Sequence, residues 1–143
     1  MKYKLSNKSL ERLNGVHPSL VFLVQSAMET QIMDFSVNEG VRTLDRQKDL
    51  VSKGFSKTMK SKHLVQSDGY GHAVDLYPYP IDMEAVNRNN AVEIVRFGVL
   101  AGIIKSIAWT HGIEIEWGGD FDSDGQTLDS TFFDAPHIQL KGS

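Results

Sequence analysis

The sequence contains no cysteine, so disulfide bonds and thiolate metal sites are both excluded. Any metal ion would have to be held by histidine and carboxylate side chains. The chain also lacks a strong excess of charge. Its formal net charge of -3 gives no electrostatic reason to expect a nucleic-acid partner. The longest apolar run, Phe97 to Ile104, is far too short to cross a bilayer, so we expect no membrane insertion.

The N-terminal stretch of residues 1–15 is charged and lacks the apolar segment of a secretory signal peptide. The sequence therefore predicts a protein that is made in a cytoplasm and stays soluble there until something else releases it. Its 143 residues, 41% of them hydrophobic, suit one compact globular unit. Because no repeat or linker interrupts the chain, we expect a single domain over residues 1–143, acting as a monomer.

Three segments show helical signals. Apolar residues recur at helical spacing over residues 18–32, and Pro18 suits a first helical turn. Thr43 can cap a helix over Leu44–Ser52, which Gly54 would end. The third segment runs from residue 90 to 111, and we expect its Trp109 to lie in the core. Its apolar stripe consists of Val92, Val95, Val99, Ile103 and Ile107, with Leu100 and Ile104 beside it.

Strand signals are short and occur over residues 33–37, 73–77, 112–117 and 137–140. Helices and strands do not alternate regularly, which argues against a doubly wound parallel sheet. The pattern favours an α+β fold in which helices pack on a small, mostly antiparallel sheet.

Unusual polar residues gather in a few places that could build a metal site. Catalytic zinc takes three protein ligands, nitrogen or oxygen in a chain without cysteine, and leaves a fourth position for water. His63, Asp75 and His137 could supply two imidazoles and one carboxylate. Asp134 lies three residues before His137, close enough to act as a general base. Five histidines and many aspartates leave other triplets equally plausible from the residues alone.

The order of several motifs narrows this choice. Ser-Lys-His63, Gly71-His-Ala-Val-Asp75 and Asp134-Ala-Pro-His137 resemble the signature of the zinc peptidases related to D-alanyl-D-alanine carboxypeptidases. Gly40-Val-Arg42-Thr-x-x-x-Gln47 and Trp117-Gly-Gly-Asp120 are similar to one branch in particular, the L-alanyl-D-glutamate endopeptidases among phage endolysins.

The resemblance implies a hedgehog/D-Ala-D-Ala-peptidase-like fold and a catalytic domain acting on the stem peptides of bacterial peptidoglycan. It also implies that His63, Asp75 and His137 bind zinc, that Asp134 is the catalytic acid/base, and that Arg42 holds the substrate or the oxyanion. The residues alone also allow Arg42 a structural ion pair with Glu39 or Asp45. Gln47, Trp117 and His72 are candidate substrate-binding residues.

One departure from the family pattern leaves the first ligand open. The usual spacing Ser-x-His-x-x-Gly-x-Ala-x-Asp is lengthened here around residues 65–69. The extra residues could form a loop beside the cleft, or His72 could replace His63 as the first zinc ligand. Because His72 and Asp75 are three residues apart, they point to opposite faces of a regular strand, which favours His63.

A second, calcium-type site is indicated by Asp120, Asp122 and Asp124, followed by Gly125. This is the D-x-D-x-D-G spacing of a calcium loop, in which alternate carboxylates converge on one hard cation. The twelfth position is Thr131 rather than the glutamate of an EF-hand. An acidic, solvated turn is the alternative.

Two other functions fit the same resemblance. One is a D-alanyl-D-alanine carboxypeptidase or dipeptidase, and the other is a non-catalytic, zinc-containing wall-binding module. The presence of Asp134 argues against the module, because a structural metal site needs no base.

Overall fold

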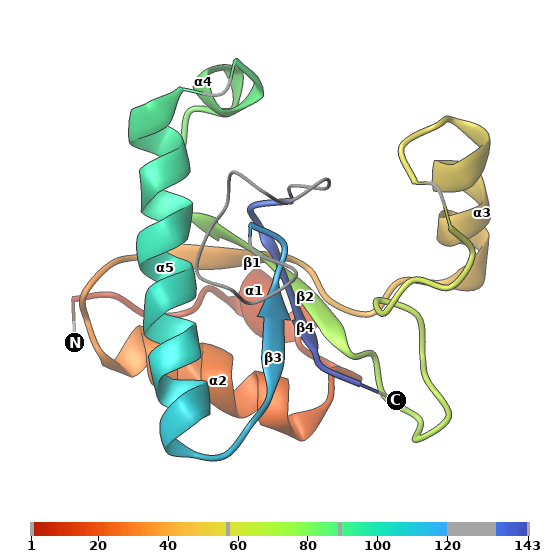
Figure 1. Ribbon diagram of the computed structural model, residues 1–143, viewed down its shortest axis with the longest axis horizontal. Helices are drawn as coiled ribbons and strands as arrows, with labels where there is room; N and C mark the ends of the chain where they lie inside the picture. The colour runs from red at the N-terminus through yellow and green to blue at the C-terminus, as the bar shows by residue number, and fades with distance from the viewer. Residues whose placement is uncertain (1, 57, 89, 120–133, 143) are drawn as a thin grey trace.

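The computed structural model describes residues 2–56, 58–88, 90–119 and 134–142 (Figure 1). Four strands form one sheet in the order β1-β2-β4-β3, and all neighbouring strands are antiparallel. The predicted α+β fold with an antiparallel sheet is confirmed. The elements along the chain are α1 (Asn7–Arg12), α2 (Pro18–Glu29), β1 (Phe35–Glu39), α3 (Leu44–Ser52), β2 (Ala73–Pro78), α4 (Met83–Asn87), α5 (Ala91–Thr110), β3 (Ile115–Trp117) and β4 (His137–Leu140).

Helix boundaries follow the local signals in the sequence. The Thr43 hydroxyl accepts a hydrogen bond from the backbone N–H of Arg46 at 3.1 Å and caps α3. Gly54, just past the end of α3, has a φ of +77° that favours glycine. Helices α1 and α4 were not expected, because segments of 6 and 5 residues are too short to show helical periodicity.

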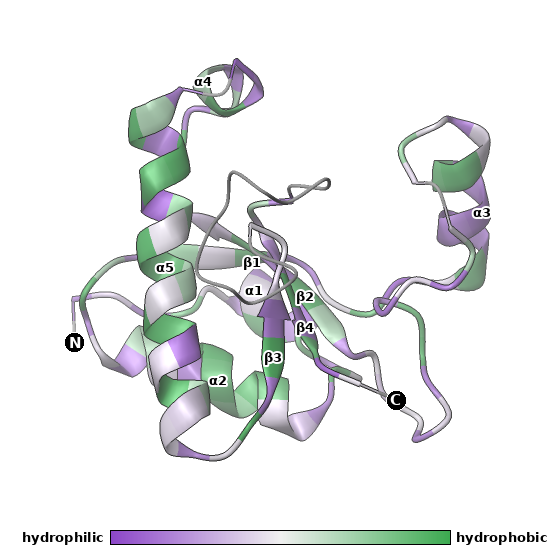
Figure 2. Ribbon diagram, in the orientation of Figure 1, coloured by the Kyte–Doolittle hydropathy of each residue, from purple (hydrophilic) through white to green (hydrophobic). Residues whose placement is uncertain are grey.

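The orientation expected for α5 was wrong for its three valines and for Trp109, whereas Ile103 and Ile107 do pack against the core. Val92, Val95 and Val99 are exposed, Val92 at 70%, and Trp109 is 88% exposed. The buried side of α5 instead consists of Phe97, Leu100, Ala101, Ile104 and Ala108. This helix is apolar on nearly all sides (Figure 2), so periodicity could not identify its inner face. Within the described residues, no helix is both long and apolar enough to cross a membrane.

The core lies between one face of the sheet and the pair α2 and α5, while α3 stands apart from them (Figure 1). Val74 and Leu76 of β2 belong to this core. Because side chains alternate along a strand, Asp75 points to the opposite face. That face carries the polar residues singled out in the sequence.

A β-bulge in β1 brings Glu39 to the same polar face. Val37 pairs with Leu76, but Glu39 pairs with Asp75, so one extra residue lies between the two positions on β1. A bulge of this kind reverses the alternation of side chains that follow it. Val37 therefore packs in the core while Glu39 lies on the face of Asp75.

Candidate metal centre

Three side chains from neighbouring strands lie in one row on the polar face of the sheet. Glu39 of β1 is opposite Asp75 of β2, and Asp75 is opposite His137 of β4. Directly opposed residues of an antiparallel pair share a face and have Cβ atoms about 5 Å apart. The sheet alone therefore gathers two of the predicted metal ligands and one further carboxylate.

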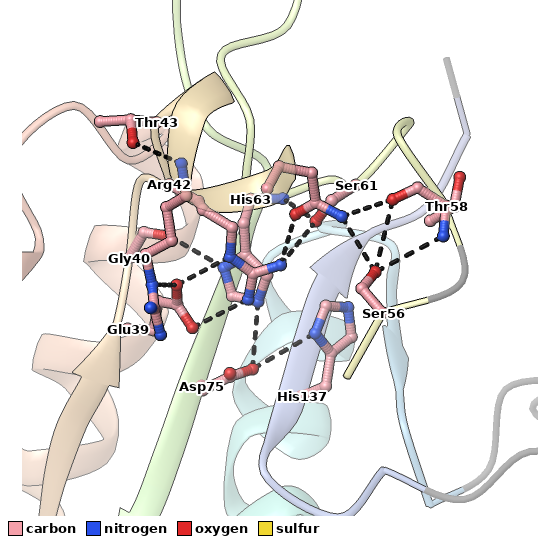
Figure 3. Close-up of polar contacts among 12 residues, drawn as sticks. Glu39, Gly40, Arg42, Thr43, Ser56, Thr58, Ser61, His63, Asp75 and His137 are labelled. Atoms are coloured by element: carbon pink, nitrogen blue, oxygen red, sulfur yellow. Dashed lines mark hydrogen bonds and ion pairs between the residues drawn. The ribbon is translucent and has the colours of Figure 1, made fainter. Parts of the chain in front are cut away.

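His63 enters this row from the segment that precedes β2 (Figure 3). Its carbonyl oxygen accepts the N–H of Arg42 at 2.8 Å, and its ring Nδ1 lies 2.9 Å from the carbonyl oxygen of Gly40. The residue is buried. These contacts fix both its backbone and its ring and leave Nε2 directed at Asp75.

The donor atoms fit a single bound ion. His63 Nε2 and His137 Nδ1 lie 3.2 and 3.3 Å from Oδ1 of Asp75. Ligands at about 2.0–2.1 Å from a tetrahedral zinc are about 3.3 Å apart. His63 can donate its ring proton from Nδ1 to Gly40, and His137 from Nε2 to Gln139 Oε1 at 2.8 Å. Each ring thus keeps a lone pair on the nitrogen that faces the centre.

Electrostatics keep the central carboxylate ionised. Burial works to raise the pKa of Asp75, but its close contacts with the His137 and His63 rings outweigh it and hold the pKa well below its usual range. Burial works to lower the pKa of His137, yet the hydrogen bond and charge of Asp75 raise it. Asp75 is therefore negative across the physiological range, as a metal ligand must be.

The backbone of Asp134 lies directly against that of Gly118, next to the metal ligand His137. Its N–H donates to the Gly118 carbonyl at 2.7 Å, and its own carbonyl accepts the His137 N–H at 3.1 Å. A Cβ atom at Gly118 would overlap the Asp134 carbonyl, so this approach requires glycine. Burial and then the charge of Asp75 raise the pKa of Asp134. A raised pKa suits a carboxylate that exchanges protons near neutral pH.

Arg42 is held in a network that occupies most of its guanidinium. Nε and Nη2 donate to the two carboxylate oxygens of Glu39 at 2.7 and 2.8 Å. Nη1 donates to Gln47 Oε1 at 2.7 Å and to Ser61 Oγ at 3.4 Å. Of the two carboxylates that the sequence offered, Glu39 is the partner. Burial works to lower the pKa of Arg42, but the bond to Glu39 outweighs it and raises the pKa.

Direct substrate contact was expected for Gln47, Trp117 and His72, but all three side chains are buried. Gln47 has no exposed surface and donates to the Thr58 carbonyl while it holds Arg42. The Trp117 indole N–H donates to the Ala135 carbonyl at 2.7 Å within the core. In this structure Gln47 and Trp117 act as internal supports, and direct contact of the three residues with a substrate stays a prediction.

His72 belongs to a second His/Asp cluster, with His17 and Asp68. Its Nε2 lies 2.7 Å from Asp68, and its buried Nδ1 has no hydrogen-bond partner among the described residues. His17 Nδ1 accepts the Ser19 N–H at 3.0 Å, which places the proton of the neutral ring on Nε2, the atom facing Asp68. In both rings the proton lies on Nε2, the atom that faces Asp68, so Nε2 has no free lone pair for a metal. The cluster is better explained by hydrogen bonds that hold the lengthened segment before β2.

The predicted calcium ligands Asp120, Asp122 and Asp124 lie outside the described residues. Glu39 was missed as a site residue except as a partner for Arg42, because the bulge that turns it toward Asp75 leaves no hydropathy signal. The described residues are consistent with a metal-dependent hydrolase: three convergent candidate ligands, an adjacent carboxylate and a neighbouring guanidinium.

Comparisons with known proteins specify the class further. The chain matches the family described as phage L-alanyl-D-glutamate peptidase over residues 1–141, and it belongs to that family. The L-alanyl-D-glutamate peptidase of Escherichia phage T5 is 25% identical over 149 residues, covering 98% of this chain and 99% of the relative. The crystal structure of Serratia marcescens L-Ala D-Glu endopeptidase ChiX is similar with a TM-score of 0.73 and 33% identity. That match covers 98% of this chain and 92% of the ChiX chain.

Proposed function

We propose that this protein is a zinc-dependent endopeptidase that hydrolyses the L-alanyl-D-glutamate bond of peptidoglycan stem peptides. One observation carries the metal dependence: His63, Asp75 and His137 face one point, with both histidine tautomers set to leave a lone pair there. The identity of the cleaved bond is proposed from the family to which the chain belongs.

A divalent ion held by these three side chains would supply Lewis acidity to the scissile carbonyl and to water. Asp134 would accept a proton from the attacking water and return it to the leaving amine. Arg42 has four of its five N–H groups engaged with described residues, counting Nε, one hydrogen of Nη2 and both of Nη1. The fifth can donate to the oxygen on which negative charge develops.

Zinc is our choice of metal because two imidazoles and one carboxylate form a common catalytic zinc set, although this donor set also suits other divalent ions. Metal analysis of the purified protein tests that choice. Kinship with the D-alanyl-D-alanine carboxypeptidases, the monomeric state and release from a host cytoplasm are further proposals. The kinship rests on the order of the motifs, and size-exclusion chromatography tests the monomeric state.

The decisive experiment is digestion of purified peptidoglycan with and without a chelator, followed by mass spectrometry of the fragments. New termini at L-alanine and D-glutamate that disappear on chelation and return with zinc are expected. Release of terminal D-alanine would assign the carboxypeptidase reaction instead. Metal binding without any cleavage would assign the wall-binding module.

A further inference from the structure

Arg46 carries an exposed guanidinium beside the metal centre. It lies in the first turn of α3, and its Nε donates to Glu39 Oε1 at 3.2 Å. The same oxygen accepts Arg42 Nε at 2.7 Å, so Glu39 bridges two arginines. One carboxylate between two guanidinium groups leaves a net positive charge at this end of the row that contains Asp75.

The fold gives no reason for a cation at this position. Thr43 caps α3, so Arg46 is the third residue of the helix, where the positive end of the helix dipole disfavours a cation. Its ion pair with Glu39 leaves most of the Arg46 side chain exposed, and an ion pair with so exposed a partner contributes little to stability. Stability therefore does not explain an arginine here.

The two arginines differ in what they can offer a ligand. The Arg42 side chain is 11% exposed, and the Arg46 side chain is 56% exposed. Among the described residues, the terminal nitrogens of Arg46 have no hydrogen-bond partner, while Arg42 has one N–H left. Only Arg46 can present a two-pronged fork to a carboxylate without breaking the network around Glu39.

We infer that Arg46 determines specificity by binding the free carboxylate of the glutamyl residue on the amine side of the scissile bond. This inference rests on the proposed function. A glutamyl residue within a chain uses one carboxylate for its peptide bond and keeps the other. That remaining carboxylate is the anion nearest to the bond being cut.

The dimensions agree with this placement. Glu39 is one strand from Asp75, and Arg46 lies beyond Glu39, so its guanidinium is roughly two strand spacings, about 10 Å, from the metal ligands. A scissile carbonyl carbon in non-bonded contact with the ligand atoms lies about 3.5–4 Å from them. An extended residue adds about 3.5 Å, and an arginine–carboxylate contact adds about 2.8 Å. These lengths total about 10 Å, so a substrate that runs toward Glu39 brings its glutamyl carboxylate to Arg46.

The test uses two synthetic stem peptides, one with the free glutamyl carboxylate and one with a carboxamide in its place. Wild-type protein should cleave the carboxylate peptide with a kcat/KM about 10- to 100-fold higher. Arg46→Gln should lose most of that preference, chiefly through KM, and should cleave the carboxamide peptide as the wild type does. Arg46→Lys should retain part of the preference, because an ammonium keeps the charge but not the fork.

Arg88→Gln is the matched control, because Arg88, the C-cap residue of α4, is also an exposed arginine with one glutamate partner. It should keep the wild-type preference. An Arg46→Gln variant that retains the preference, or that loses activity equally on both peptides, would overturn the role of Arg46 alone. A wild-type protein that cleaves neither peptide would overturn the proposed function and this inference with it.

Discussion

The backbones of Gly118 and Asp134 are in direct contact: the Asp134 N–H donates to the Gly118 carbonyl at 2.7 Å, and no Cβ atom fits between them. The Gly118 N–H donates in turn to the His137 carbonyl at 2.7 Å. One glycine thereby sets the position of the proposed proton acceptor relative to a metal ligand.

Replacing this glycine should displace Asp134. We expect Gly118→Ala to lower kcat at least about 10-fold, since small misplacements of a catalytic group cost up to about 100-fold. Gly102→Ala is the control, because a Cβ at this exposed position in α5 meets no atom within 4 Å. That variant should be as active as the wild type and slightly more stable, because alanine favours a helix. Steady-state assays and thermal melting measure both effects.

Asp134→Asn should remove proton transfer while leaving the metal ligands intact. A positioned acid/base contributes about 10²- to 10⁴-fold, so kcat should fall by that factor. Metal content, measured by elemental analysis, should equal that of the wild type. An active Asp134→Asn variant would exclude this carboxylate from the mechanism.

The metal-free protein should lose stability as the pH rises above neutrality. The pKa of His137 is raised in the folded state, so its contribution is complete below the ordinary histidine pKa of about 6.5 and is lost as pH rises through the raised value. The lowered pKa of Asp75 gives the opposite sign, with stability lost below about 3.9. Metal needs neutral His137, so added zinc should raise the melting temperature most at the higher pH.

Calorimetry of the protein with a chelator and with zinc, over a series of pH values, tests this prediction. His137→Ala is the control and should flatten the decline above neutrality. An unchanged pH profile in that variant would assign the decline to another group.

Gln47→Leu should weaken both the fold and the site. Gln47 is fully buried, and its amide joins Arg42 to Ser56 and Thr58. Leaving such partners unpaired costs about 1–3 kcal/mol of unfolding free energy. Chemical denaturation should show that loss, and kcat should fall with it. Lys48→Leu, at the exposed neighbouring position, should change neither quantity substantially.

The calcium site stays a prediction from the spacing of Asp120, Asp122 and Asp124. Calcium added after chelation should raise the melting temperature of the wild type, and Asp122→Asn should reduce that rise. Magnesium serves as the ionic control. The absence of any response to calcium would favour an acidic turn.

Local signals predicted the local structure well. Thr43 and Gly54 fixed both ends of α3, and the Ala73–Tyr77 alternation placed β2 within one residue. The inner face of α5 could not be predicted, because its apolar residues surround the helix. Its orientation depends on packing against α2 and the sheet.

The candidate site depended on resemblance, because His63, Asp75 and His137 are distant in sequence and meet only through strand pairing and a loop. The choice between His63 and His72 was open from the residues alone. In the structure, the hydrogen bonds of the second ring nitrogen distinguish them, and no single-sequence pattern encodes those bonds.

The bulge in β1 accommodates one residue more than the pairing with β2 requires. If the strand paired regularly with Asn38 in place, Asn38 would oppose Asp75, and Glu39 would turn toward the core side of Val37. Removing Asn38 has a different result, because Glu39 then follows Val37 directly and regular alternation keeps it opposite Asp75. Deletion of this one residue should therefore leave the carboxylate shared by Arg42 and Arg46 in place, and a related chain one residue shorter here could hold both arginines in the same way.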